Sequence, residues 1–566
     1  MTELPTIHPV DGKARTGWHR IGPALARLWT RIVEHKVAQW MLAYVAFAYA
    51  CLHFEQMLGE AFAWHTTIMR ITTVALIAGV PVTIALAWYL HKTGRSAEAP
   101  PHSTAAAQAP PEKSIAVLPF IDMSELKDQE YFSDGLAEEL IALLTGVSEL
   151  RVPARTSSFY FKGKQATIPE IAAALHVAHV LEGSVRKAGN TIRVTVQLIR
   201  VDTGYHLWSQ AYDRTLEDIF KVQDEIAAAV VRALSVALLS SALPVRSAVP
   251  NPEAYQLYLR GRFHWNRRSP EDFRKAVGFF QQAIAIEPRY ALAYTGLADC
   301  YSLLPIYDRT ARATETMPQA KTAILQALAI EDGLAEAHAS LGLILALYEF
   351  DWAGAERQFQ RAIELNPKAP APHQWYGELL VNLGRVEAGL AESRSAVALD
   401  PLSQVANLAL GIALNSARRF EEAIAQLQAT LKIGRKFADT NYFLFEAHAN
   451  MKAYQEAVAV YARQKKLDGE SAASVEAFRA AYANDSWPGF LRQRIKVLEA
   501  EPLPVAEEIA SFYARLGDVD QAMGWLEKSY ADRSARLTHL KVEARYDNLR
   551  ADPRFARLLQ QVGLAS

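Results

Sequence analysis

The sequence predicts a multi-domain chain: a two-span transmembrane α-hairpin, then a small α/β domain, then an α-solenoid of repeats. Three observations predict it. Two long apolar runs lie near the N-terminus, runs typical of strands occupy the middle, and small residues recur at a fixed interval through the second half. The 566 residues leave room for several domains of roughly 150 residues each.

The charge balance excludes one broad class of function. The chain has 60 Lys and Arg against 61 Asp and Glu, a formal net charge of −1. Proteins that grip nucleic acid usually present a strongly basic surface, so no nucleic-acid partner is expected. The two cysteines, Cys51 and Cys300, form no CxxC motif, so neither a disulfide framework nor a structural zinc site is expected.

The first two predicted segments are a basic cytoplasmic tail, residues 1–36, and a transmembrane hairpin, residues 37–91. Residues 37–54 and 71–90 carry no formal charge, and each run nearly matches the roughly 30 Å bilayer core. The tail holds six basic residues, whereas the connection between the runs holds only Arg70. The positive-inside rule therefore predicts a multi-pass protein of the bacterial inner membrane that contacts the bilayer through residues 37–91, with its other domains cytoplasmic. A pair of buried core helices is the alternative.

Residues 92–112 are predicted to be an Ala/Pro-rich linker, because two Pro-Pro pairs interrupt an alanine-rich stretch. The α/β domain is assigned to residues 113–240. It opens with the apolar run SIAVLPF, typical of a buried strand, and Ser133 is a candidate cap of the helix that follows. Thr167 and Glu170 have capping-box spacing ahead of a second helix.

Two strands are predicted on either side of the turn at residues 188–190. The second alternates, with Ile192, Val194, Val196 and Leu198 expected to point inward. A further strand and a long amphipathic helix complete a βαβαβββα-like order.

One stretch of this domain is a candidate phosphate cradle, residues 154–159 together with residues 161–164. A P-loop needs a glycine before the Gly-Lys pair and a hydroxyl after it, but Phe159 lies before the pair and Gln165 follows it. A structural turn is therefore favoured over a nucleotide site. The adjacent acids Glu138 and Glu139 are expected on a solvent-exposed helix face.

Residues 251–566 are predicted to be an array of helical repeats. Small residues recur at Ala276, Ala320, Ala355, Gly389, Ala423 and Ala457, at intervals of 44, 35, 34, 34 and 34 residues. An interval of 34 residues is the tetratricopeptide spacing. Ten extra residues around 305–317 indicate an insertion, and the next match, Ala522, indicates one degenerate repeat before it. The C-terminal string DPRFARLLQQVGL is predicted to form a capping helix.

The strings YFSDGLAEELIALL, RVPARTSSFYFKGK and HVLEGSVRKAGNTIRVTVQLIRVDTGYHLWSQAYDR resemble the TolB-like domain of bacterial membrane-anchored proteins that continue into tetratricopeptide repeats. Members of this family carry adenylate cyclase, winged-helix or protein-kinase modules ahead of the membrane segment. This chain has only 36 residues before the first apolar run, so the resemblance does not imply those activities. TolB itself is periplasmic, but the charge bias favours a cytoplasmic placement.

No HExxH, GxSxG, GxGxxG or kinase motif occurs, so no catalytic, cofactor-binding or metal-binding residue is predicted. The predicted function is a membrane-anchored, non-catalytic scaffold that binds protein partners through the repeat groove, in bacterial signalling or envelope-associated assembly. Two alternatives stay open. One is a ligand or nucleotide sensor whose α/β domain binds a small molecule and whose repeats relay it, and the other is an undetected enzyme in the α/β domain.

The predicted partner-binding residues come from the repeat register. In such arrays the first helix of each repeat lines the concave face, and counting back from the small residue gives the positions that point into it. An acid followed one turn later by an Asn suits a peptide backbone and a Lys or Arg side chain. Solvation of an open groove is the alternative. The six positions are Gln374, Glu378, Asn382, Tyr442, Glu446 and Asn450.

Overall fold

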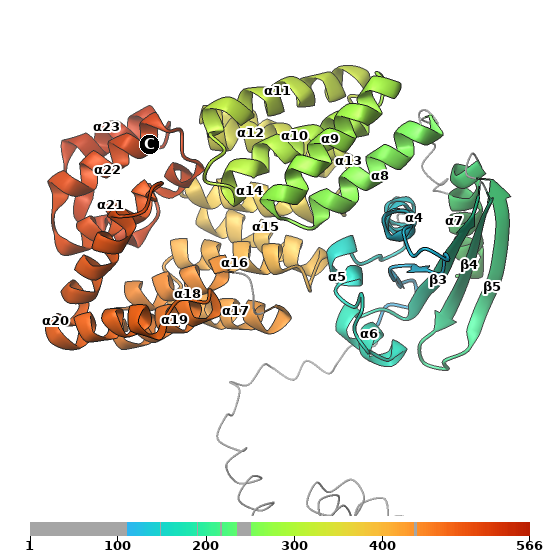
Figure 1. The fold of residues 1–566 in the computed structure, drawn as a ribbon, viewed down its shortest axis with the longest axis horizontal. Coiled ribbons are helices and arrows are strands. Elements are labelled where there is room, and N and C mark those ends of the chain that lie inside the picture. The colour runs from blue at the N-terminus through green and yellow to red at the C-terminus, as the bar shows by residue number, and fades with distance from the viewer. Residues whose placement is uncertain are drawn as a thin grey trace, which may run out of the picture. The chain divides into compact units, whose positions relative to one another are not determined.

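The computed structural model describes residues 110–147, 149–189, 191–215, 218–234, 251–434 and 438–565. All of them belong to one unit, Pro110–Ser566, which is separate from the unit Met1–Ala109. Within these residues the fold is mostly helical, with one small sheet (Figure 1).

The predictions of a two-span hairpin and of an inner-membrane localisation are contradicted. Within the described ranges, no helix is both long and apolar enough to cross a bilayer. The longest of them, α20 (Ala472–Glu499), has 28 residues, but seven of these are charged. The tail at 1–36, the hairpin at 37–91 and most of the linker at 92–112 lie outside the described residues.

The sheet has the strand order β1-β3-β4-β5, and β2 pairs with β3 off this path. β1 pairs with β3 in parallel, whereas β3, β4 and β5 form an antiparallel meander. The four β4 residues predicted to point inward are fully buried, which confirms the alternation. The strands are β1 (Ile115–Val117), β2 (Ile121–Asp122), β3 (His179–Ala188), β4 (Thr191–Arg200) and β5 (His206–Thr215).

Four helices accompany the sheet: α4 (Glu130–Thr145), α5 (Arg155–Phe159), α6 (Ile168–Leu175) and α7 (Ile219–Ala233). The Thr167 capping box of α6 is confirmed, since both of its reciprocal hydrogen bonds form. α4 begins earlier than predicted, so Ser133 lies buried inside its first turn and caps nothing. The second strand of the predicted order is reduced to one bridge between Ser114 and Arg151.

The second half consists of helix pairs that pack in sequence order, with the recurring small residues in the second helix of each pair. The pairs are α8 (Pro252–Asn266) with α9 (Pro270–Ile286), α10 (Ala291–Tyr307) with α11 (Ala313–Ile330), α12 (Ala335–Ile344) and its π-helical extension η2 (Leu345–Glu349) with α13 (Trp352–Leu365), α14 (Pro370–Asn382) with α15 (Val386–Leu399), α16 (Gln404–Ser416) with α17 (Phe420–Ile433), α18 (Ala438–Asn450) with α19 (Tyr454–Leu467), and α21 (Ala506–Leu516) with α22 (Val519–Ala531).

Small residues allow the paired helices to approach closely. A Cβ atom added at Gly377 in α14 would lie 2.8 Å from the carbonyl oxygen of Gly389 in α15, and one added at Gly389 would lie 2.6 Å from the carbonyl oxygen of Gly377. The two backbones therefore touch at Gly389, one of the small residues that recur at the repeat interval.

Both irregularities predicted in the repeat pattern are visible in the helices. The insertion lengthens α10 and α11 to 17 and 18 residues. The degenerate repeat is α20, which bends at Asp485 and Ser486, where the backbone leaves the helical region.

The C-terminal helix α23 (Pro553–Gln561) does more than cap the last repeat. The Trp352 indole N–H at the start of α13 donates a 2.8 Å hydrogen bond to the carbonyl oxygen of Val562. The ring of Tyr530 in α22 also stacks on Phe350, with centroids 6.5 Å apart. The C-terminal end of the array therefore returns to its third helix pair, and the array closes on itself.

Candidate partner-binding chamber

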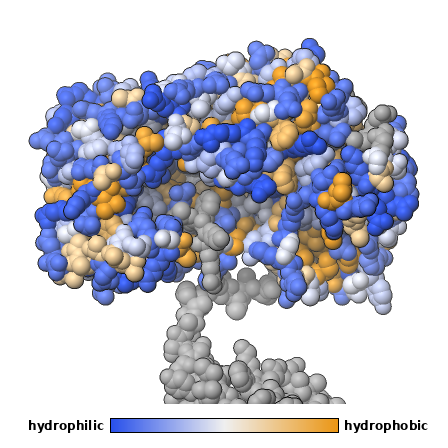
Figure 2. Space-filling view, viewed as in Figure 1, coloured by the Kyte–Doolittle hydropathy of each residue, from blue (hydrophilic) through white to orange (hydrophobic). Residues whose placement is uncertain are grey.

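The closed array surrounds a cavity of about 2240 Å³, the central chamber. Its walls come from the first helices of the repeats (α10, α12, α14 and α16) and from α4 and α5 of the α/β part. The C-terminal segment adds a further wall through the 3-10 helix η3 (Ala535–His539) and through Arg545 at the start of the 3-10 helix η4 (Ala544–Leu549). On the face of the molecule shown in Figure 2, hydrophilic side chains predominate.

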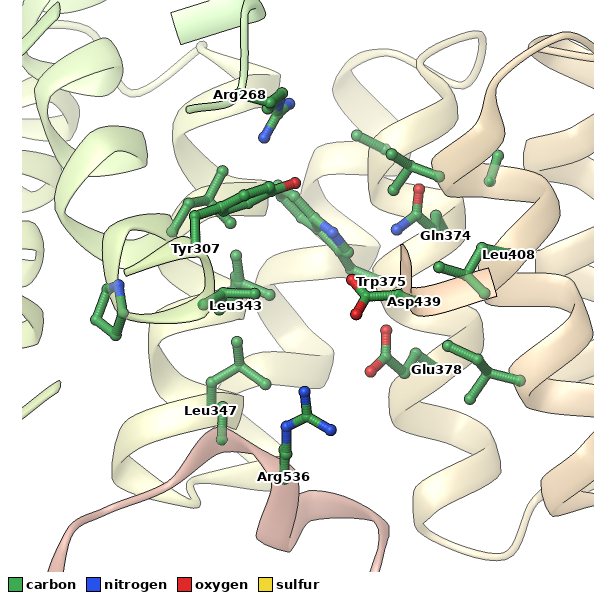
Figure 3. A pocket seen from close by; sticks show the side chains of 18 of the residues that line it. Arg268, Tyr307, Leu343, Leu347, Gln374, Trp375, Glu378, Leu408, Asp439 and Arg536 are labelled. Carbon is green, nitrogen blue, oxygen red and sulfur yellow. The ribbon is translucent and has the colours of Figure 1, made fainter. Parts of the chain in front are cut away.

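The chamber wall mixes apolar and polar side chains (Figure 3). Tyr307, Leu343 and Leu347 lie on one side, and Trp375 and Leu408 come from helices α14 and α16. Aromatic and aliphatic surface with interspersed polar groups suits an extended peptide, because the apolar groups supply contact area and the polar groups satisfy the backbone.

The structure brings three of the six predicted partner-binding residues to this wall. Gln374, Glu378 and Tyr442 line the central chamber, whereas Asn382, Glu446 and Asn450 do not. In both helices, the predicted position nearest the C-terminal end, Asn382 in α14 and Asn450 in α18, does not line the chamber.

Two of the lining residues are already engaged by the C-terminal segment. Arg545 donates a 2.6 Å hydrogen bond to the Tyr442 hydroxyl, and Nε2 of His539 lies 3.3 Å from Oε1 of Glu378. Burial opposes the charged form of His539, but its hydrogen bond to Glu378 and the negative charge of Glu378 raise the pKa of His539 above its usual value. The Glu378 carboxylate thus already has a histidine partner within the chain.

The remaining three predicted residues have structural contacts. Glu446 is buried and accepts hydrogen bonds of 2.7 and 3.2 Å from Arg515 of α21, and Asn450 accepts one of 3.0 Å from the same guanidinium. Asn382 is buried beside Leu379 and Thr538. The predicted ladder of acid and Asn in α18 therefore holds α21 in place.

Sequence reasoning missed Lys368, which joins the repeats to the α/β part. Its ammonium group donates to the carbonyl oxygens of Val147 (2.7 Å), Leu150 (3.1 Å) and Thr145 (3.2 Å), just beyond the last turn of α4. A cation is stabilised there because the last carbonyls of a helix lack intrahelical partners. A lysine that precedes a repeat helix gives no sequence signal of this contact.

Asp400 makes a second link, and it lies where the candidate phosphate cradle was considered. Its carboxylate accepts a 3.0 Å bond from the Ser157 amide and another from the Ser157 hydroxyl, and that hydroxyl accepts a 2.9 Å bond from the Leu402 amide. Burial raises the pKa of Asp400, although the hydrogen bonds from Ser157 oppose the rise. Residues 155–159 form α5, which binds a carboxylate of the same chain and so has a structural role.

The prediction that Glu138 faces solvent is wrong. Its carboxylate pairs with Arg155 of α5 at 2.9 Å and with Arg262 of α8 at 2.5 Å. Burial would raise its pKa, but the charges of the two arginines outweigh burial and hold the pKa of Glu138 below its usual value. Glu138 therefore ties α4 to α5 and to the first repeat helix.

Comparison with known proteins gives partial matches. No protein-family model matches the chain. The Rhizobium meliloti (strain 1021) protein named "Putative adenylate cyclase 3" is 38% identical over 257 residues, which are 44% of this chain and 42% of that protein. Transcriptional regulator HilA of Salmonella typhimurium is 24% identical over 316 residues, 53% of each chain. The chain thus spans about half the length of the curated relatives it matches.

Similar solved structures are tetratricopeptide and pilus-biogenesis proteins. YrrB, described as a TPR protein with an unusual peptide-binding site, is 19% identical and covers 34% of this chain and 93% of its own, with a TM-score of 0.25. PilW, a type IV pilus biogenesis factor, is 18% identical and covers 39% and 96%, with a TM-score of 0.32. At such scores, the assignment of tetratricopeptide-like repeats rests on the 34-residue spacing and the helix pairs of the chain itself.

Proposed function

We propose that this chain is a non-catalytic scaffold that holds an extended segment of a protein partner in the central chamber. The observation that carries the proposal is the chamber, whose wall is built from the first helices of the repeats, from α4 and α5, and from the C-terminal segment.

The size of the chamber supports a peptide rather than a small molecule. Pockets for small ligands usually enclose roughly 300–1,000 Å³. The central chamber encloses about 2240 Å³. A metabolite would leave most of the wall uncovered, whereas a peptide strand could contact opposite sides at once.

The chemistry of the wall supports a role in binding rather than catalysis. Among the chamber carboxylates, Glu378, Glu508 and Glu543 each pair with a basic side chain of the same chain. For Glu508, burial would raise the pKa, but the charge and hydrogen bond of Arg494 outweigh burial and lower it, so this carboxylate is poorly suited to transfer protons near neutral pH.

A place in signalling is part of the proposal. One of the relatives reported above, HilA, is named as a transcriptional regulator, and the other is named "Putative adenylate cyclase 3". The alternative of a nucleotide sensor has less support, since its best candidate site, residues 154–159, already binds Asp400.

A photo-crosslinking amino acid at Gln374 tests the proposal. This residue lines the central chamber, so the cross-linker should capture a protein segment in cells, and mass spectrometry should locate the cross-link in one partner sequence. The matched control is the same substitution at Gln282, which is exposed on α9 and does not line the chamber. Equal capture from both positions, or none from Gln374, would contradict the proposal.

A further inference from the structure

Eight arginines line the central chamber, and two of them differ from the rest. Six lie within ion-pair distance of a carboxylate: Arg155, Arg262, Arg309, Arg312, Arg494 and Arg545. Among the described residues, no carboxylate lies that close to Arg268 or Arg536. Both project into the chamber (Figure 3).

The electrostatic surroundings of these two arginines are opposite. Burial disfavours the charge of Arg536, but Tyr442, Glu507 and Asp439 more than compensate and raise its pKa. For Arg268, burial dominates and lowers the pKa, because Tyr307 and Asp299 offset it only in part and the charge of Arg262 acts in the same direction as burial. Of these two arginines, Arg268 is therefore the one whose burial the surrounding charges do not offset.

The backbone at Arg268 is also unfavourable for an arginine. It lies in the turn between α8 and α9 with a φ of 55°, in the left-handed region that side chains other than glycine rarely adopt. The corresponding turns after α14 and α21 use Gly384 and Gly517. An arginine thus occupies a position where glycine would be less strained.

Another turn shows how such a strained arginine is compensated within the chain. Arg418, between α16 and α17, has a φ of 62°, and its two terminal nitrogens each donate a 2.7 Å hydrogen bond to the Asp547 carboxylate. Arg268 has the same backbone conformation but no such partner among the described residues. Lys452 and Arg533 share this conformation and also lack a carboxylate partner in the described part of the chain, so it is the place of Arg268 in the chamber wall that distinguishes it.

The Arg268 side chain is held in position without being neutralised. Its guanidinium carbon lies 3.8 Å from the centroid of the Trp265 ring. Stacking on an aromatic face fixes the plane of a guanidinium and leaves its N–H groups free to donate in that plane. Figure 3 shows Arg268 beside Tyr307 at the chamber wall.

We propose that Arg268 binds a carboxylate of the protein segment in the central chamber, so that the partner contributes an acidic segment containing Asp or Glu. The inference rests on the proposed function and names its specificity. A carboxylate would accept two parallel hydrogen bonds from the guanidinium and supply the charge that the chain does not. This preference for an acidic segment replaces the preference for Lys or Arg that the sequence suggested, since the Glu378 carboxylate is already paired with His539.

Arg268→Gly in the full chain tests the inference by fluorescence anisotropy. The probes are three short labelled peptides in which Ala alternates with Glu, Gln or Lys. We expect the Glu peptide to bind the wild-type chain most tightly. Arg268→Gly should weaken the affinity for the Glu peptide by about 10- to 100-fold, as for a lost charge-assisted hydrogen bond, and should leave the affinity for the Gln peptide unchanged. The unfolding temperature should not fall, because glycine adopts a φ of 55° readily.

Two further variants sharpen the result. Lys452→Gly changes a basic residue in the corresponding turn after α18, with a φ of 61°, that does not line the chamber, so it should leave peptide binding unchanged. Arg268→Lys retains the charge but not the bidentate geometry, so its affinity for the Glu peptide should be intermediate.

Each contrary outcome has a distinct meaning. Equal binding of all three peptides, unaffected by Arg268→Gly, overturns this inference while the chamber remains a peptide site. Failure of every peptide, together with no cross-link from Gln374, overturns the proposed function itself. Binding of a single-stranded oligonucleotide that depends on Arg268 more strongly than the Glu peptide does would overturn the assignment of an acidic protein segment. An unfolding temperature lowered by Arg268→Gly would show that the arginine is structural.

Discussion

Replacing Glu446 with Gln should destabilise the closed array rather than only weaken partner binding. Glu446 is 3% exposed and accepts two hydrogen bonds from Arg515, at 2.7 and 3.2 Å. The substitution removes the negative charge and leaves the Arg515 guanidinium nearly buried, with the Asn450 amide oxygen as a neutral partner at 3.0 Å.

The contacts set the expected size of the effect. Removing one partner of a buried ion pair usually costs about 3–5 kcal/mol, because the other charge stays buried without compensation. Gln retains one acceptor oxygen and Asn450 retains its bond, so we expect the lower end, about 3 kcal/mol. The double variant Glu446→Leu with Arg515→Met removes both charges and should recover most of that loss, to within about 1 kcal/mol of wild type.

Urea unfolding combined with hydrogen exchange of the α18 and α21 amides measures this effect, since a chain of this size need not unfold in one step. The single variant should lose protection in both helices, and the double variant should regain it. Unchanged protection in the single variant, with partner capture lost, would refute the structural role and support the partner-binding role predicted from the repeat register.

Three other predictions test the junction, the helix crossings and the closure. Asp400→Ala should cost about 1–3 kcal/mol and expose α5 to proteolysis, whereas Asp400→Asn, which keeps an acceptor, should cost less. Gly278→Ala should raise the unfolding temperature slightly, because no atom lies within 4 Å of the new Cβ, whereas Gly377→Ala should lower it, because that Cβ would meet an α15 carbonyl oxygen at 2.8 Å. The folded-state pKa of His539 is raised, so the stabilisation from its contact with Glu378 is fully present below about pH 6.5 and is lost as the pH rises through the folded-state pKa. After correction for the intrinsic pH dependence of hydrogen exchange, the backbone amides of η3 should exchange faster at high pH than at low pH. His539→Gln should abolish this difference between the two pH values.

The parts of the fold that follow from short-range pattern could be predicted from sequence. The capping box of α6 is set by two residues three apart, and the inward face of β4 is set by strict alternation. The close crossing of α14 and α15 follows from glycines twelve residues apart that a repeat register identifies. In each case, one stretch of chain contains both groups that interact.

The closure of the array could not be predicted, because its contacts join residues far apart in the sequence. Trp352 donates to a carbonyl oxygen 210 residues away, and Arg515 pairs with an acid 69 residues before it. A tryptophan or an arginine on a helix surface is compatible with many partners, and only the curvature of the whole array selects one. The same limit applies to Glu138. Its position next to a second acid, Glu139, suggested a solvent-exposed helix face, but its partner is an arginine 124 residues away in the sequence.

Closure also changes which residues of the repeats are available to a partner. In an open array, equivalent positions of successive first helices present equivalent side chains, so a ladder read from the register is a reasonable binding surface. In this chain, Glu446 of α18 is buried and, like Asn450, accepts hydrogen bonds from Arg515, and the equivalent acid of α14 faces His539. Equivalence by register is therefore lost where the C-terminal segment returns. A guanidinium on the chamber wall without a carboxylate partner among the described residues is instead that of Arg268, in the turn between α8 and α9. A partner carboxylate bound by Arg268 would contact a turn whose residues differ from repeat to repeat. Because the binding group then occurs at one place and is not repeated along the helices, it would fix the direction and the register of the bound strand.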